Sequence, residues 1–137
     1  MAEKKIIMTN IFAKMGATFY VLWGLLHIEA ARKVYLLGQS LEPGMIQGRI
    51  FQVAWTLLAA ALIGIFVGIF LNWKNNRLGY WLNLTVVSFT DIGFIVAVLI
   101  PGYIALVPGA LGPVLWILAL AFSTLAAKGV GHFGRAT

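Results

Sequence analysis

The sequence predicts an all-α integral membrane protein, an up-down bundle of four transmembrane helices that forms a single domain over residues 1–137. Only 10% of the residues are charged and 61% are hydrophobic, whereas soluble domains carry about 25% charged residues. Four apolar segments, at about 11–37, 50–71, 78–100 and 104–127, are long enough to cross a hydrocarbon core about 30 Å thick. None alternates like the strand of a membrane barrel, so all four are expected to be helices.

The first three segments are joined by short connections, which predict that sequential helices run antiparallel. The second segment contains Ala60, Gly64 and Gly68, a ridge of small residues that permits close approach of helices. The third follows the Asn-rich tight turn "NWKNN" and is flanked by aromatic residues that suit the membrane interface.

The fourth segment is irregular because "PGYIALVPGALGP" places three prolines and three glycines in an uncharged stretch. Pro101 is expected to end the third helix, and Pro113 is well placed at the start of the last one. A helix over 113–128 would be about 24 Å long, a little short for a full crossing. We therefore expect 101–112 to form a hydrophobic loop or broken half-helix packed over the outer end of the bundle. One long, Pro-kinked helix is the alternative.

The basic residues orient the chain, because short cytoplasmic loops are enriched in Lys and Arg. One side of the predicted bundle carries Lys4, Lys5, Lys14, Lys74, Arg77, Lys128 and Arg135. The other side carries Arg32, Lys33 and Arg49. Both termini are therefore predicted to be cytoplasmic. The basic start lacks an apolar run followed by a cleavage site, so no removable signal peptide is expected. The basic residues form no stripe on a polar surface, so nucleic-acid binding is not expected.

Several cofactor and metal chemistries do not fit the residues. The chain has no Cys, and its two histidines, His27 and His132, are predicted at opposite depths. They cannot ligate one haem together, and they supply no common zinc set. Paired Glu-x-x-His motifs, nucleotide-binding loops and a mid-membrane Lys for a Schiff base are absent from the sequence. We therefore expect no metal and no cofactor.

Asp91 is the residue that most needs an explanation, because it lies in the middle of the apolar stretch "LTVVSFTDIGFIVAV". It follows Arg77 by fourteen residues, which places it about 21 Å above that end of the membrane. His27 follows Lys14 by thirteen residues and lies about 20 Å up by the same count. A charged group at such depth is costly and usually faces the protein interior. Asp91 and His27 are therefore predicted to share one level in the outer half of the bundle.

Other polar and aromatic side chains converge on this level. Ser88 lies one turn before Asp91 and is its natural local partner. Glu29 can pair with Arg32, and this pair is alternatively just a charged helix end in the headgroup region. The predicted substrate-binding set consists of Trp23, Glu29, Arg32, Gln52, Trp55, Thr56 and Ser88.

Three functions remain open at this point. Asp91 and His27 could be catalytic residues that perform acid–base chemistry on a terpenoid- or sterol-like molecule, such as isomerisation, hydration, epoxide opening or cyclisation. Alternatively, the chain is a non-catalytic subunit or assembly factor in which Asp91 clamps His27 or Arg32 across a helix contact. A small oligomeric transporter coupled to protons is the third hypothesis. The expected partners are membrane lipids, a lipophilic small molecule, and further copies of the chain or partner membrane subunits.

Overall fold

The structure, a computed structural model, describes residues 2–129, which are largely helical and contain no strand. Four of the helices are long and apolar enough to cross a membrane. They are α1 (Ala2–Gln39), α2 (Met45–Phe70), α3 (Arg77–Phe94) and α5 (Leu111–Gly129). His132 and Arg135, both used in the sequence-based predictions, lie outside the described residues.

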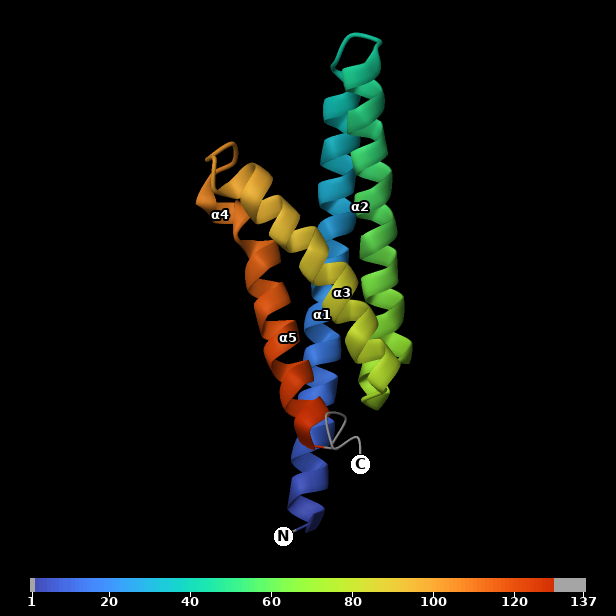
Figure 1. Cartoon of the computed structure of the whole chain (residues 1–137), viewed down its shortest axis with the longest axis vertical. Coiled ribbons are helices and arrows are strands. Elements are labelled where there is room, and N and C mark those ends of the chain that lie inside the picture. The colour runs from blue at the N-terminus through green and yellow to red at the C-terminus, as the bar shows by residue number, and fades with distance from the viewer. Residues whose placement is uncertain (1, 130–137) are drawn as a thin grey trace, which may run out of the picture.

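Helices α1 and α2 form a long antiparallel hairpin that extends beyond the other helices at one end (Figure 1). Its connection is held by Gln47, whose side-chain amide donates to the carbonyl oxygens of Gly38 and Leu41, both at 3.1 Å. The end of the molecule that carries this connection is called the outer end below. At Gly24 the backbones approach so closely that a Cβ atom would lie 2.8 Å from the carbonyl oxygen of Ala61.

The small residues of α2 face α1, as a packing ridge requires. A Cβ atom at Gly64 would lie 3.1 Å from the indole ring of Trp23, and one at Gly68 would lie 3.4 Å from the carbonyl oxygen of Ala17. Gly64 and Gly68 are buried and Ala60 is partly buried. Because Gly64 has no side chain, the large indole ring of Trp23 fits between the helices.

Two asparagines of the Asn-rich turn between α2 and α3 have different roles. A short 3-10 turn, η1 (Asn72–Lys74), leads to Asn75, which adopts a left-handed conformation with φ of 52°. Asn is one of the few residues other than Gly that tolerates this conformation. Asn76 then caps α3, because its side-chain oxygen accepts from the backbone N–H of Leu78 at 2.8 Å and of Gly79 at 3.4 Å.

Helix α3 crosses α1 obliquely and leaves the α1–α2 hairpin toward the outer end (Figure 1). It continues as a π-helix, η2 (Ile95–Leu99), and the chain then reaches the short helix α4 (Leu106–Gly109). Residues 101–108 are all exposed. The connection therefore does not pack over the outer end of the bundle as expected, because the tilt of α3 carries it to one side. Helix α5 begins at Leu111, so the fourth segment is broken and is not one long helix.

The core lies where α1, α3 and α5 meet, and its central side chains are Tyr20, Trp23, Val87 and Ala119. Residues 95–111 contain no buried residue. His27 and Asp91 are buried and lie toward the outer limit of this core. These two residues thus lie near the outer limit of the region where α1, α3 and α5 meet.

Candidate functional site

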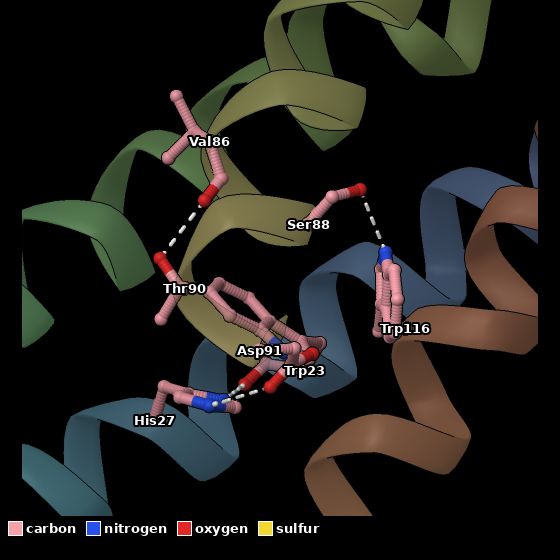
Figure 2. Close-up of polar contacts among 7 residues, drawn as sticks. All are labelled: Trp23, His27, Val86, Ser88, Thr90, Asp91 and Trp116. Carbon is pink, nitrogen blue, oxygen red and sulfur yellow. Dashed lines mark hydrogen bonds and ion pairs between the residues drawn. The ribbon is translucent and has the colours of Figure 1, made fainter. Parts of the chain in front are cut away.

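Asp91 is fully buried and is held by two side chains of α1 (Figure 2). The indole Nε1 of Trp23 donates to Asp91 Oδ2 at 2.7 Å. His27 Nε2 lies 3.5 Å from Asp91 Oδ1, the other carboxyl oxygen. Since Trp23 and His27 are one turn apart on α1, they present two nitrogen atoms to one carboxyl group on α3.

The orientation of His27 is fixed from its other side. Its Nδ1 lies 2.8 Å from the backbone carbonyl oxygen of Trp23. A carbonyl oxygen can only accept a hydrogen bond, so we assign the proton to Nδ1. The imidazole ring also stacks on the Trp23 indole, with ring centroids 3.9 Å apart. His27 therefore directs Nε2 at Asp91.

The contact places an imidazole nitrogen of His27 opposite a carboxyl oxygen of Asp91 in a buried position. With Nδ1 protonated, Nε2 of a neutral imidazole is an acceptor and would repel an ionised carboxyl oxygen. A proton on either Nε2 or Oδ1 removes this repulsion and leaves the pair with no net charge, which favours its burial. Oδ1 makes no hydrogen bond to any described residue. The arrangement is thus one in which the two side chains could share a proton.

Helix α5 packs closely against this pair. A Cβ atom at Gly112 would lie 2.9 Å from His27 Cε1 and 3.5 Å from Asp91 Oδ1. Gly112 is therefore needed for the start of α5 to reach the pair. Within residues 2–129, no group of three His, Asp or Glu side chains could hold a metal ion.

Ser88 lies beside the pair but does not bind Asp91, its expected partner. Its hydroxyl accepts a hydrogen bond from Trp116 Nε1 at 2.9 Å (Figure 2). Helix α3 is thus held by two tryptophan N–H groups, one from α1 and one from α5. Reasoning from the sequence did not select Trp116, and it placed Trp23 in the substrate-binding set without predicting its bond to Asp91. The available signal was that a buried indole N–H requires an acceptor.

Glu29 and Arg32 are near this level along α1 but do not join the pair. They form a two-pronged ion pair with each other, with N–O distances of 2.7 and 2.8 Å. Their side chains are 47% and 60% exposed, respectively. This ion pair is exposed, but α1 continues for seven residues beyond Arg32, so the ion pair does not lie at the end of the helix. It gives Asp91 no arginine partner.

The three candidates on α2 also lie apart from the pair, on the exposed surface of α2. Gln52 accepts a hydrogen bond from Arg49 at 2.9 Å, and the Thr56 hydroxyl donates to the carbonyl oxygen of Val53 at 2.9 Å. Trp55 is 67% exposed. The structure therefore brings together Trp23, His27 and Asp91 of the predicted set, with Ser88 beside them.

Comparison of the chain with protein-family models, with curated proteins and with solved structures finds no match. The functional interpretation therefore rests on the chemistry of the Asp91–His27–Trp23 cluster.

Proposed function

We propose that this chain is a multi-pass membrane protein whose Asp91–His27 pair performs acid–base chemistry on a lipophilic substrate. The observation that carries the proposal is the contact between Asp91 Oδ1 and His27 Nε2 at 3.5 Å, in a place where Oδ1 has no hydrogen bond. General acid–base catalysis needs a proton donor and an acceptor within reach of one reacting group. An intramembrane ionisable group is in itself an indication of a functional site.

In the proposed topology, the four long helices cross the membrane in alternating directions and both termini are cytoplasmic. The excess of Lys and Arg at the inner end supports this orientation. The pair then lies in the outer half of the bilayer, about 20 Å from the inner boundary. A substrate there would be dissolved in the membrane, which favours a terpenoid- or sterol-like molecule over a polar metabolite.

A pair that holds one proton suits a reaction in which the substrate loses one proton and gains another. In an isomerisation, neutral His27 takes a proton from a C–H bond of the substrate while protonated Asp91 gives its proton to another carbon, and a double bond moves. The proton on His27 then passes to Asp91, and the pair returns to its starting state. Trp23 would position Asp91 through its N–H bond to Oδ2 throughout this cycle.

The substrate would approach from the outer end. Residues 95–108, which follow the end of α3 and include most of α4, contain no buried residue. Few packing contacts therefore oppose a displacement of this segment, and segments of this kind open at low free-energy cost. π-helices such as η2 are also frequent near functional sites.

The proposal is tested by mass spectrometry of the molecules that the detergent-purified protein retains. We expect wild type to retain a specific lipophile and Asp91→Asn to lose at least nine-tenths of it, an effect of about tenfold. Thr90→Val is the matched control, because the Thr90 hydroxyl is already bonded to the Val86 carbonyl oxygen at 2.8 Å (Figure 2). Incubation in D2O should place deuterium on carbon in the retained molecule with wild type and Thr90→Val only. Retention of bulk phospholipid alone would contradict the proposal.

A non-catalytic subunit is the second candidate, and one observation favours it. The Trp23–Asp91 bond joins α1 to α3 in a fully buried position, as a purely structural clasp would. In that case wild type retains no specific lipophile and is stable only with one fixed partner protein. Asp91→Asn should then weaken co-purification of that partner.

A further inference from the structure

Three buried oxygen atoms lie on the inner side of the Asp91–His27 pair and lack hydrogen-bond partners among the described residues. They are the Tyr20 hydroxyl on α1, Asn83 Oδ1 on α3 and Ser123 Oγ on α5. Tyr20 and Asn83 are 0% exposed and Ser123 is 5% exposed. In an apolar protein interior, each such atom costs about 1–3 kcal/mol when it is left unpaired. Three of them at the junction of three helices therefore need an explanation.

The packing of the helices brings the Tyr20 and Ser123 hydroxyls close together, with Asn83 on the neighbouring helix α3. A side chain at Gly16 would collide with Ser123 Oγ, so α1 and α5 are in close contact there. Tyr20 is one turn further along the same face of α1. Its hydroxyl lies near that of Ser123, at a geometry that falls short of a regular hydrogen bond, and Tyr80 is also close to it. Tyr80 is three residues before Asn83 on α3, and both of these side chains are buried.

We propose that Tyr20, Asn83 and Ser123 bind internal water, and that this water is the route by which the Asp91–His27 pair exchanges its proton with the inner end of the bundle. Buried water typically makes about three hydrogen bonds to otherwise unsatisfied polar groups. Two hydroxyls and an amide oxygen offer it both donors and acceptors. The role given to the pair rests on the proposed function, whereas the binding of water does not.

Polar contacts extend from this site in both directions. Toward the inner end, the hydroxyls of Tyr80 and Thr124 are 3.2 Å apart. Toward the pair, Asn83 Nδ2 donates to the carbonyl oxygen of Gly64 at 3.3 Å.

One layer separates the water site from the pair. The Trp23 indole lies against Gly64 and donates to Asp91, and Val87 is fully buried at the same level. Asp91 is eight residues beyond Asn83, or about 12 Å along the helix. The barrier to proton exchange therefore consists of Trp23 and Val87.

Water at the site is tested by solid-state NMR of the protein in lipid bilayers, with magnetisation transferred from water to side-chain amides. We expect the Asn83 amide to receive magnetisation within about threefold of the rate of the exposed Asn76 amide. The conservative double variant Tyr20→Phe, Ser123→Ala should slow the transfer to Asn83 severalfold and leave Asn76 unchanged. Transfer to Asn83 as slow as that to the backbone amide of buried Ala61 would overturn the proposal.

The exchange route is tested on the Trp23 indole N–H. NMR can follow the exchange of its proton for deuterium. We expect Tyr20→Phe, Ser123→Ala to slow this exchange severalfold and Val87→Ala, which thins the barrier, to speed it severalfold. Thr85→Ala is the control, because that exposed hydroxyl bonds its own helix at the Trp81 carbonyl oxygen. An exchange rate that neither variant changes would overturn the route.

These measurements need no substrate, so they are independent of the test of the proposed function. Slow transfer of magnetisation from water to Asn83 overturns the water site even if Asp91→Asn releases a retained lipophile. Conversely, a hydrated Asn83 together with retention of bulk phospholipid alone overturns the proposed function and leaves the water site in place.

Discussion

At the scale of single residues, Asp91 is tolerable in an apolar core because a different neighbour contacts each of its carboxyl oxygens. Inserting an Asp at the centre of a membrane helix costs about 2.5–3.5 kcal/mol. Trp23 satisfies one carboxyl oxygen at 2.7 Å, and His27 faces the other at 3.5 Å. In the proposed function, one proton shared with His27 keeps the pair neutral in total. The indole N–H is therefore as important to the site as the two ionisable groups.

The first prediction compares the two tryptophans that bind α3. Trp23→Phe removes the donor to Asp91 Oδ2 and leaves a buried carboxyl oxygen without a partner, so we expect a loss of about 1.5–3 kcal/mol in the free energy of unfolding. Trp116→Phe removes a neutral bond to Ser88, and the expected loss is about 1 kcal/mol. The measurement is unfolding in detergent micelles. Equal losses in the two variants would show that Asp91 does not depend on Trp23.

At the scale of helices, the start of α5 completes the site because Gly112 has no side chain. The helix continues for 19 residues from Leu111, so its position is set by packing along α1, and this packing brings Gly112 against His27. The prolines and glycines of residues 101–113 thus serve two purposes. They break the chain between α3 and α5, and they allow the new helix to begin directly beside the pair.

The second prediction tests this close approach. Gly112→Ala places a Cβ atom 2.9 Å from His27 Cε1, so the imidazole must shift away from its stack on Trp23. We expect a destabilisation of about 1–3 kcal/mol, typical of overpacking, and a change in the NMR signals of the His27 ring. Gly93→Ala is the matched control, because no atom lies within 4 Å of a Cβ atom there. An unchanged His27 ring in Gly112→Ala would contradict the observed packing.

At the scale of the whole molecule, the distribution of basic residues predicts the orientation in the membrane. The turn at Lys74 belongs to the same end as the N-terminal part of α1, and Glu42 lies in the α1–α2 connection at the opposite end (Figure 1). Both of these side chains are exposed. They therefore offer positions from which the two sides of the membrane can be distinguished.

The third prediction uses the absence of cysteine from the sequence. In intact cells, a maleimide that cannot cross membranes should label Glu42→Cys within minutes and should leave Lys74→Cys unlabelled. Permeabilised cells should give about equal labelling of both. The cysteine-free parent chain is the control for background labelling. Labelling of Lys74→Cys alone in intact cells would reverse the proposed orientation.

The sequence alone predicted the four long apolar helices, because length and hydrophobicity decide which segments can cross a bilayer. It also predicted that Asp91 and His27 lie at one level, because the rise of a helix per residue is constant. The structure brings the two side chains together. The same depth count grouped Glu29, Arg32 and Gln52 with them, and these side chains lie elsewhere, in partly or fully exposed positions.

What only the tertiary structure decided is the direction in which each side chain faces and which helices meet. Depth along a helix follows from the sequence number, but the rotation and tilt of a helix follow from its packing against the others. The oblique crossing of α3 over α1 selects Trp23 as the partner of Asp91. The same tilt carries residues 101–108 away from the hairpin, where the sequence suggested a cap. The contact of Trp116 with Ser88 depends on all of these placements at once, so no local pattern could predict it.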